Sequence, residues 1–595
     1  MCGIAGILTT NPILLDVPIQ RMQAALQHRG PDDHGIYLSP YHQAALAHTR
    51  LAILDLSPAG HQPMSTPNGR YHITFNGEIY NFQALRSQLI QQGETFHSQT
   101  DTEVILKLYQ RVGSDCVKQL RGMFSFAIWD EQEQTCFLAR DPLGIKPLYY
   151  WQSGSTLIFA SELRAVLASR LPTAQLSPTG LYGYLISGSV QEPHTLIEGI
   201  YCLPAGYQLR WQVGQVSQQQ YWQVQFGNEP ISAAEAQAKV RAALVDSIQH
   251  HFISDVPVGI FLSGGIDSTA ITALARQTQA GIIHTYSITF EDTAWSEGTI
   301  AKKTAQHFET QHTEHCMTAA QGRSLLPKFL ATLDQPSIDG FNTFCVSQIA
   351  QQQGMKVVIS GLGGDELFGG YKSFQRIPQM VRWGRQLKPL SPLTAAVGKG
   401  LERWSTSSQL KRIGDFLQQA PTSTAAYHSF RGIFTHQEAC ILARQYLPEA
   451  LAFQRPQGNP DHRFSSLEDE VSALEITQYM RNQLLRDSDV MSMAWGLELR
   501  VPLVDRQLLE AIASIPSSVR LAQGKQLLVQ AVPELPPWVL NQPKRGFSFP
   551  FQKWLDAEWQ DYFPTLDHAP NISHDLWYRR WSLAILHHWW QQISL

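Results

Sequence analysis

Short apolar segments separated by turn signals characterise the first ~215 residues of the chain. Residues 124–129 and 135–139 are apolar and flank an acidic turn at 130–133, a pattern typical of a β-hairpin. Another apolar stretch, 73–75, leads into Asn76-Gly77, a dipeptide typical of tight turns. Helical spacing occurs around 24–26 and over 102–109. The pattern predicts a layered, strand-rich domain.

The pattern changes after a polar, glutamine-rich stretch at 212–220, which indicates a connection between domains. Helical runs at 233–250 and 269–279 then alternate with apolar runs at 256–262 and 282–290. This alternation is typical of a doubly wound parallel sheet covered by helices on both faces. Beyond about residue 374 the spacing is mainly helical. We therefore predict an α/β protein with two domains, 2–215 and 233–595, joined by a linker at 216–232.

Composition agrees with two folded domains. The chain has 595 residues, and single cores stop growing at roughly 250–300 residues. It is 43% hydrophobic and 16% charged, which excludes disordered and low-complexity classes. The formal net charge of −4 argues against a nucleic-acid-binding protein.

The cysteines and the apolar N-terminus bear on location. Seven cysteines are scattered with no C-x-x-C spacing, which favours reduced thiols in the cytoplasm. The first eight residues are apolar, but the first basic residue is Arg21, so a signal peptide is not expected. Nor does any apolar run reach 18 residues, so we expect a soluble chain without a membrane segment. The sequence leaves the oligomeric state open, with a homodimer as one alternative.

Cys2 is the first candidate catalytic residue in the chain. Removal of Met1 would make it the amino-terminal residue, with its thiol beside an α-amine of pKa about 7.7–8.0. That amine can act as the general base, so a catalytic His is not required. The structural alternative is that Cys2 merely begins a buried strand.

Four further residues could complete an amide-hydrolysing site around Cys2. An amino-acid substrate needs a cation for its carboxylate and an anion for its ammonium group, roles that Arg50 and Asp101 could fill. Asn76 and the Gly77 N–H group could donate hydrogen bonds to an oxyanion at a tight turn. Each of them, taken alone, also fits a solvated charge or a hairpin turn.

Together these segments resemble the class II glutamine amidotransferase domain of the N-terminal nucleophile hydrolases. The matching segments are Met1-Cys2-Gly3-Ile4-Ala5-Gly6, His28-Arg29-Gly30-Pro31-Asp32, Arg50-Leu51-Ala52-Ile53, Asn76-Gly77-Glu78-Ile79-Tyr80-Asn81 and Arg140-Asp141-Pro142-Leu143-Gly144-Ile145-Lys146-Pro147-Leu148-Tyr149. The resemblance implies an αββα sandwich over 2–205, with Cys2 forming a thioester with glutamine and releasing ammonia. It also implies an oxyanion hole at Asn76 and Gly77, and glutamine binding by Arg50, Leu51, Ala52, Ile53, Leu54, Glu78 and Asp101.

Two glycine-rich segments in the second domain follow apolar strands. Ser263-Gly264-Gly265-Ile266-Asp267-Ser268 lies between a strand and a helix, where backbone N–H groups can bind phosphate. No Gly-Lys-Ser/Thr follows, so it is not a Walker loop. The second segment, 360–371, holds Asp365 and Glu366 among five glycines. Carboxylates in such a loop suit Mg²⁺, which takes one or two of them plus phosphate oxygens.

These segments resemble the PP-loop ATP pyrophosphatases, and the whole chain resembles the glutamine-hydrolysing asparagine synthetases. Further matches are Asp489-Val490-Met491-Ser492-Met493-Ala494, Leu497-Glu498-Leu499-Arg500-Val501-Pro502-Leu503-Val504-Asp505 and Lys544-Arg545-Gly546-Phe547. The resemblance implies that ATP adenylates a carboxylate, that pyrophosphate leaves, and that ammonia attacks the acyl-adenylate. The implied roles are ATP binding by Leu262, Ile288, Ser360 and Gly361, pyrophosphate binding by Ser263, Gly264, Gly265, Asp267 and Ser268, Mg²⁺ binding by Asp267 and Asp365, support of the intermediate by Glu366, and stabilisation of developing charge by Lys544.

The sequence identifies the acceptor substrate less closely than it identifies glutamine and ATP. The chain departs from the family pattern at Trp295-Ser296-Glu297, at Asp487 and over 334–340, in the region expected to hold aspartate. Aspartate is the expected acceptor, and a sugar acid or a peptide side chain is the alternative. A β-lactam synthetase is disfavoured because Cys2 is retained, and a sugar-phosphate aminotransferase would lack the phosphate loop. A non-catalytic scaffold conflicts with the full set of reactive residues. Because ammonium cannot attack, we also expect an apolar tunnel between the sites.

Overall fold

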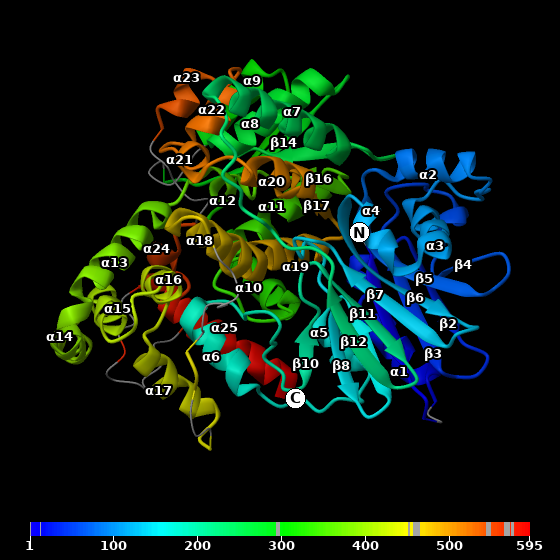
Figure 1. The fold of residues 1–595 in the computed structure, drawn as a ribbon, viewed down its shortest axis with the longest axis horizontal. Helices are drawn as coiled ribbons and strands as arrows, with labels where there is room; N and C mark the ends of the chain where they lie inside the picture. The colour runs from blue at the N-terminus through cyan, green and yellow to red at the C-terminus, as the bar shows by residue number, and fades with distance from the viewer. Residues whose placement is uncertain are drawn as a thin grey trace.

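A computed structural model describes residues 2–11, 14–292, 298–449, 453–455, 464–542, 549–563, 572 and 576–594. Within these residues the chain forms two antiparallel sheets of six strands each and one parallel sheet of five strands. The two antiparallel sheets lie together in the N-terminal half, and the parallel sheet lies among the helices of the C-terminal half (Figure 1). Of the predicted sites, Lys544 and the departure at 295–297 lie outside the described residues.

The N-terminal half is built from two stacked sheets. The first has the order β10 (Ile200–Cys202), β8 (Tyr149–Ser153), β9 (Thr156–Ala160), β1 (Gly3–Leu8), β3 (Ala44–Arg50) and β2 (Asp33–Leu38). The second has the order β12 (Gln215–Gln220), β11 (Tyr207–Gln212), β7 (Thr135–Arg140), β6 (Gly122–Asp130), β5 (Tyr71–Ile79) and β4 (Met64–Ser65). The hairpin predicted around the acidic turn at 130–133 is confirmed as β6 and β7.

Alternation along the strands explains the layers. In β1, Ile4 and Leu8 face the second sheet and pack in one cluster with Trp129, whereas Ala5 and Ile7 pack in the cluster of α1 (Asp16–Ala25) and α5 (Leu163–Ala168). On the far side, the second sheet packs against α2 (Phe82–Gln91) and α3 (Asp101–Val112). Because successive side chains of a strand point to opposite faces, an apolar strand buried on both faces fits between two layers. The expected αββα sandwich is confirmed.

Two local predictions in this half are wrong. Asn76-Gly77 does not turn the chain, because β5 continues through both residues and Gly77 pairs with Phe124 of β6. Glycine is needed there for close approach, since a Cβ atom on Gly77 would lie 2.1 Å from the carbonyl oxygen of Met123. The glutamine-rich stretch is not a connection either, because 215–220 forms β12. It lies at the edge of its sheet, where exposed polar side chains are tolerated.

The C-terminal half contains the predicted parallel sheet. Its order is β15 (Gln311–Cys316), β14 (His284–Thr289), β13 (Val258–Phe261), β16 (Val357–Ile359) and β17 (Glu498–Arg500), and every neighbouring pair is parallel. The accompanying helices include α7 (Ala233–His251), α8 (Ile266–Thr278), α9 (Gly298–His307), α10 (Ala319–Thr332), α11 (Phe341–Gln352) and α12 (Gly364–Phe368). The predicted helices and strands of 233–290 are confirmed to within a few residues.

The remainder is helical, as predicted. Its main elements are α13 (Ser373–Leu387), η4 (Lys388–Leu390), α14 (Ser391–Trp404), α15 (Ser408–Leu417), α16 (Ser423–Arg431), α17 (His436–Tyr446), α18 (Leu467–Leu474), the π-helix η5 (Glu475–Leu485), α19 (Arg486–Met493), α20 (Arg506–Ala513), α22 (Gln526–Ala531), α24 (Phe551–Asp556) and α25 (Trp577–Ser594). Among the helices that the structure describes, none combines the length and the apolar character needed to cross a bilayer.

Candidate active sites

Cys2 lies immediately before β1 and is largely buried, with 8% of its surface exposed. Its backbone nitrogen donates a hydrogen bond to Asn76 Oδ1 at 3.0 Å, and its carbonyl oxygen accepts one from Arg29 Nε at 3.0 Å. Burial raises the pKa of the Cys2 thiol, so a thiolate does not form without help. The site therefore fixes the backbone of the thiol-bearing residue and leaves the thiol in need of a base.

Asn76 supplies a donor at this position. The side chain is fully buried, and its Nδ2 group has no hydrogen-bond partner among the residues described. Leaving such a donor unsatisfied costs roughly 1–3 kcal/mol, so unpaired buried amides call for an explanation. Since Oδ1 of the same amide contacts the Cys2 backbone, the free N–H group lies beside the thiol-bearing residue. A substrate oxygen that becomes an oxyanion would satisfy it.

Arg50 lies at the end of β3 and is enclosed by the loop that follows. Its guanidinium donates to the backbone oxygens of Ser57 at 3.0 Å, Leu54 at 3.3 Å and Asp55 at 2.5 Å. The loop passes so close that a Cβ atom on Gly60 would lie 1.9 Å from Arg50 Nη2. The predicted glutamine-binding stretch, Leu51, Ala52, Ile53 and Leu54, forms the buried start of this loop. The structure thus holds the predicted carboxylate-binding group rigidly.

Asp101 and Glu78 both lie at the end of β5. Asp101 begins α3, and its Oδ2 accepts a hydrogen bond from the backbone nitrogen of Ile79 at 2.9 Å, which fixes the carboxylate against the end of β5. Burial raises the pKa of Asp101 to about 7. Glu78 points toward the second domain, with Oε1 3.6 Å from Arg500 Nη2. Hydrogen bonds join Cys2 to Asn76 and Asp101 to β5, whereas Arg50 is held by its own loop.

The predicted phosphate loop closes on itself between β13 and α8. Ser263 Oγ and Ser268 Oγ are 3.2 Å apart, and the backbone nitrogen of Ser263 donates to Ser268 Oγ at 3.3 Å. Gly264 has φ +76°, a conformation that favours glycine. Since β14 and β16 both pair with β13, Ile288, Leu262, Ser360 and Gly361 all lie at or beside the same carboxyl edge of the sheet. Ligands bind at such edges in open α/β sheets.

The second glycine segment packs directly on the phosphate loop. A Cβ atom on Gly361 would lie 3.0 Å from the backbone nitrogen of Ser268, and one on Gly364 would lie 2.3 Å from Asp267 Oδ1. Side chains at these two positions would therefore drive the loops apart. The glycines are required for the approach that puts Asp365 near Asp267.

Lys525 was missed by sequence reasoning. Its Nζ lies 2.5 Å from Asp267 Oδ2 and 2.5 Å from Asp365 Oδ1, so it bridges the two carboxylates predicted to hold Mg²⁺. Burial opposes the charge of Lys525, but the two carboxylates outweigh it and raise its pKa. Lys525 precedes α22 with φ +56° after Gly524, and this weak turn signal was the only local clue.

The same pair of carboxylates fits a divalent cation. Both converge on one positive charge, and Mg²⁺ takes one or two carboxylates together with phosphate oxygens and water. Within the part of the chain that the structure describes, no cluster of three or more His, Cys, Asp or Glu side chains is placed to hold a metal. The described residues therefore do not supply enough ligands to bind a metal alone. Two carboxylates fit a site whose remaining ligands are phosphate oxygens of the substrate and water.

Glu366 is buried in α12 beside the two carboxylates. Its Oε1 accepts a hydrogen bond from the Tyr371 hydroxyl at 2.9 Å. Burial, together with the neighbouring charge of Asp365, raises the pKa of Glu366 to about 7. The group is therefore poised to exchange a proton near neutral pH. Lys544, predicted for the same site, lies outside the described residues.

Charged residues tie the two domains together. Arg29 donates to Glu162 Oε1 at 2.9 Å and to Asp489 Oδ2 of α19 at 2.8 Å, and Lys146 Nζ lies 3.2 Å from Asp489 Oδ1. These four side chains are almost completely buried. Because Arg29 also holds the Cys2 carbonyl oxygen, α19 is linked to the nucleophile segment through one side chain.

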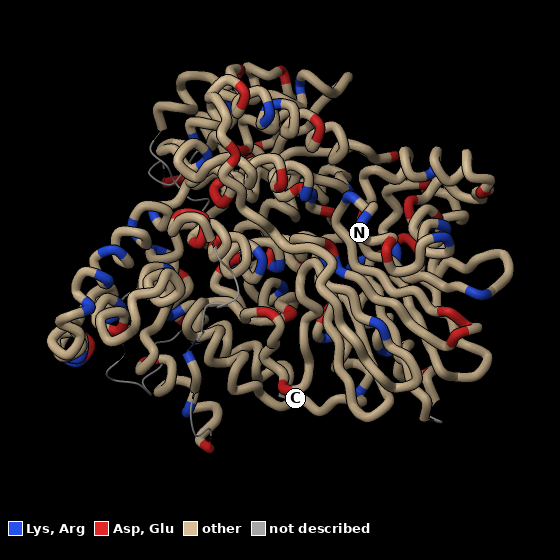
Figure 2. The backbone as a smooth tube through the Cα atoms, in the orientation of Figure 1, with Lys and Arg blue, Asp and Glu red and all other residues tan. Residues whose placement is uncertain are grey.

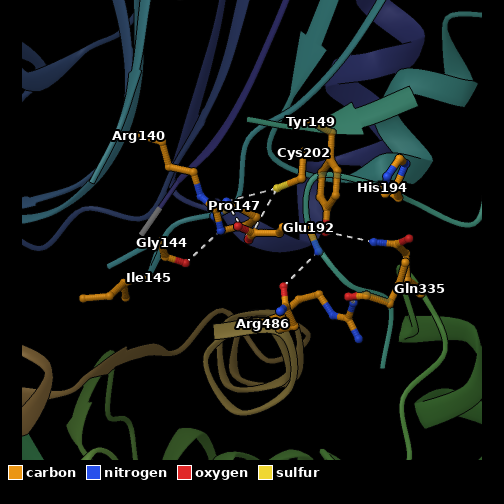
Figure 3. Close-up of a pocket in the computed structure, with 12 residues that line it drawn as sticks. Arg140, Gly144, Ile145, Pro147, Tyr149, Glu192, His194, Cys202, Gln335 and Arg486 are labelled. Carbon is orange, nitrogen blue, oxygen red and sulfur yellow. Dashed lines mark hydrogen bonds and ion pairs between the residues drawn. The ribbon is translucent and has the colours of Figure 1, made fainter. Parts of the chain in front are cut away.

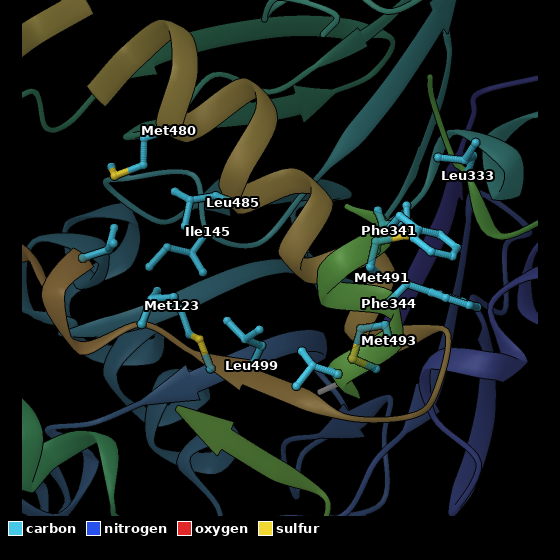
Figure 4. Close-up of a cluster of buried hydrophobic side chains, with 14 of the residues drawn as sticks. Met123, Ile145, Leu333, Phe341, Phe344, Met480, Leu485, Met491, Met493 and Leu499 are labelled. Atoms are coloured by element: carbon cyan, nitrogen blue, oxygen red, sulfur yellow. The ribbon is translucent and has the colours of Figure 1, made fainter. Parts of the chain in front are cut away.

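Apolar side chains fill the rest of this interface. Met123 and Ile145 of the first domain lie in one buried cluster with Met480, Leu485 and Leu499 of the second (Figure 4). A small cavity of about 10 Å³ nearby is lined by Arg140, Cys202 and Glu192 of the first domain and by Gln335 and Arg486 of the second (Figure 3). It has room for about one water molecule and is too small for a substrate.

Two of the departures from the family pattern touch each other. The Ser337 hydroxyl donates a hydrogen bond to Asp487 Oδ2, so the loop 334–340 is fastened to the start of α19. Burial raises the pKa of Asp487 to about 7. The loop 334–340 and Asp487, both expected from the sequence to differ from the family pattern, therefore meet in a single contact.

Both halves of the chain match known protein families. Residues 1–222 match the glutamine amidotransferase domain, and residues 239–591 match asparagine synthase. Asparagine synthetase [glutamine-hydrolyzing] 1 of Bacillus subtilis is 32% identical over 591 residues, covering 94% of this chain and 89% of the relative. Amidase chry2 of Gibberella zeae is 27% identical and covers 93% of this chain and 90% of its own.

Solved structures add little. The allosteric regulatory enzyme of purine biosynthesis is 17% identical, covers 53% of this chain and 80% of its own, and reaches a TM-score of 0.30, which carries no argument. The sequence matches over both domains, together with the αββα sandwich and the parallel sheet bearing the phosphate loop, establish that the chain belongs to the family of glutamine-hydrolysing asparagine synthetases.

Proposed function

We propose that this chain makes asparagine from aspartate, glutamine and ATP, releasing AMP and pyrophosphate. The observation that carries the proposal is the pairing of two unlike sites in one folded chain. One has a buried cysteine beside an unsatisfied amide donor, and the other has two glycine loops in contact beside two carboxylates. The names of the relatives agree with this pairing.

In the first site Cys2 Sγ attacks the side-chain amide carbon of glutamine. The thiol proton passes to the α-amine of Cys2, exposed by removal of Met1, and then to the leaving nitrogen, which departs as ammonia. Asn76 Nδ2 and the Gly77 N–H group donate hydrogen bonds to the oxyanion, and water then cleaves the thioester. Arg50 binds the α-carboxylate of glutamine and Asp101 its ammonium group. Glu78 and the stretch 51–54 shape the pocket.

In the second site the loop Ser263–Ser268 holds the β- and γ-phosphates of ATP through backbone N–H groups at the start of α8. Leu262, Ile288, Ser360 and Gly361 contact the nucleotide. Asp267 and Asp365 would hold Mg²⁺, which would supply positive charge to offset that of pyrophosphate. Lys525 adds a positive charge at the same point. Lys544 is proposed to stabilise the charge that develops on the phosphate or the tetrahedral carbon. Glu366, with its pKa of about 7, moves a proton as ammonia attacks the acyl-adenylate.

Ammonia has to cross from Cys2 to the second site without becoming ammonium. The buried apolar cluster of Met123, Ile145, Met480, Leu485 and Leu499 lies at the domain interface and supports a dry passage there. The tunnel itself stays a prediction. We also propose that the chain is located in the cytoplasm, because its seven cysteines are not in disulfides. A homodimer is one proposed form of assembly.

A second candidate is amidation of a different carboxylate by the same mechanism. The altered contact between Ser337 and Asp487 favours it, because it lies where the acceptor is expected. One relative that matches over most of its length is named an amidase and not an asparagine synthetase. The test is an acceptor screen with glutamine and ATP, scored by release of AMP. Release with aspartate supports asparagine synthesis, whereas release only with a sugar acid or a peptide would replace aspartate as the acceptor.

A further inference from the structure

Helices α13, α14 and α15 form an extension of the second domain. They lie at the edge of the molecule, away from the two antiparallel sheets (Figure 1). The chain leaves α13 through η4 into α14, and α15 then packs back against α14. Close packing fixes this pair, since a Cβ atom on Gly398 of α14 would lie 2.5 Å from the carbonyl oxygen of Gly414 of α15.

The outer face of this extension is apolar. Trp383 is 63% exposed and Trp404 is 79% exposed, and Leu387, Leu390, Leu393 and Val397 are exposed between them. In α14, Leu393, Val397 and Trp404 recur at i, i+4 and i+11, which places them on one face. Gly398 and Glu402, on the opposite face, are buried. A surface helix normally buries its apolar face, so α14 has the reverse orientation.

The same extension is strongly basic. Residues 372–412 hold nine Lys or Arg and one acidic residue, Glu402, in a chain whose formal net charge is −4. The basic positions gather on these helices (Figure 2). Arg382 pairs with Glu468, and Lys411 with Glu438. Among the described residues, six exposed cations here have no acidic partner: Lys372, Arg376, Arg385, Lys388, Lys399 and Arg403. The half-buried Arg412 donates to the backbone oxygen of Ser429 instead.

The exposed cations of α14 lie on a separate face from the apolar stripe. Lys399 and Arg403 are four residues apart, so they lie together on a third face of α14, about 100–140° around the helix from the stripe. An apolar face with tryptophan, flanked by unpaired Lys and Arg, is the composition of helices that lie in the plane of a membrane surface. Tryptophan favours the boundary between headgroups and acyl chains, and basic residues bind anionic headgroups.

We propose that the α13–α14 face docks on the surface of a membrane that contains anionic phospholipids, with α14 lying in the interface. A second copy fits this face less well. A symmetric dimer would place the same six cations against one another, and like charges across an interface are unfavourable. The proposal concerns surface attachment, and it is independent of the proposed function.

Cosedimentation with lipid vesicles tests the proposal on the full chain. Phosphatidylcholine vesicles are compared with vesicles in which a third of the lipid is phosphatidylglycerol, at low and high salt. We expect pelleting with the anionic vesicles only, weakened by salt. Replacing both Lys399→Gln and Arg403→Gln should lower the partition coefficient about thirtyfold, at roughly fivefold per cation near the surface. Leu393→Ser with Trp404→Ser should also weaken binding, but without changing its salt dependence.

A matched control lies on the first domain. Tyr41 is 72% exposed and Arg210 is also exposed, so Tyr41→Ser with Arg210→Gln removes one aromatic side chain and one cation elsewhere. This variant should pellet like the unmodified chain, and ammonia-dependent synthesis should be unchanged in all variants. Equal pelleting with neutral vesicles, no pelleting, or full binding by the α14 variants would overturn the proposal. So would sedimentation velocity showing a dimer that the α14 variants dissociate, because the face would then bind a second copy.

Discussion

The buried link between α19 and the nucleophile segment makes a prediction for Asp489→Asn. Asp489 accepts from Arg29 at 2.8 Å and from Lys146 at 3.2 Å, and all three side chains are at most 1% exposed. Asparagine keeps the shape but removes the charge, which leaves Lys146 without its carboxylate and Arg29 with Glu162 alone. Removing one partner of a buried ion pair costs about 3–5 kcal/mol. We expect a loss of that size in the free energy of unfolding.

The functional consequence should be unequal between the two sites. Arg29 Nε fixes the Cys2 carbonyl oxygen at 3.0 Å, so a displaced Arg29 disturbs the nucleophile while leaving the phosphate loop intact. Glutamine hydrolysis should therefore fall further than ammonia-dependent synthesis, measured on the folded variant as glutamate release and AMP release.

The matched control is Glu468→Gln, which breaks the exposed pair with Arg382 and should cost less than about 1 kcal/mol. Urea unfolding compares the two variants under one condition. If Asp489→Asn destabilises the chain no more than Glu468→Gln, the buried network does not join the domains as argued. An equal loss of both activities would refute the specific link to Cys2.

Three further predictions concern single groups. Asn76→Ala should lower kcat for glutamine hydrolysis about 10²–10³-fold with little change in KM, because it removes an oxyanion donor; unchanged kcat would exclude that role. Gly364→Ala should abolish synthesis but spare glutaminase activity, since its Cβ would lie 2.3 Å from Asp267 Oδ1, whereas Gly183→Ala, with 3.9 Å of space, should spare both. The pKa of Glu366 is about 7 in the folded chain against 4.5 ordinarily, so the folded state keeps a proton that the unfolded state releases, and stability falls as pH rises between these values. Between these pH values Glu366 should lower the free energy of unfolding by about 3 kcal/mol, and Glu366→Gln should abolish that decrease, as measured by urea unfolding at several pH values. If the free energy of unfolding of the variant falls with pH as steeply as that of the unmodified chain, Glu366 is not the group responsible.

The sequence was sufficient for the layers and the loops but not for the contacts between distant segments. Short apolar segments bounded by turn signals and the strand–helix alternation predicted the sheets correctly, because each pattern is local. Asn76-Gly77 was misjudged since a glycine that permits close approach to Met123 looks the same as one that permits a turn. Lys525 was missed because it meets Asp267 across 258 positions and carries no motif of its own. In the same way, nothing local shows that Ser337 contacts Asp487.

Helix α19 of the second domain connects the two sites physically. The nucleophile segment, Arg29 and Asp489 form a continuous buried path from the first site to α19. Asp487, on the same helix, contacts the loop where the acceptor is expected. The acceptor loop and the nucleophile segment are therefore both fastened to α19.

Separate assays of the two half-reactions in Cys2→Ala test the central claim most directly. The account predicts that this variant loses glutamine hydrolysis and glutamine-dependent synthesis, yet still releases AMP and forms product when ammonium replaces glutamine. Loss of ammonium-dependent synthesis in a folded Cys2→Ala chain would contradict it, because the thiol would then be required at both sites.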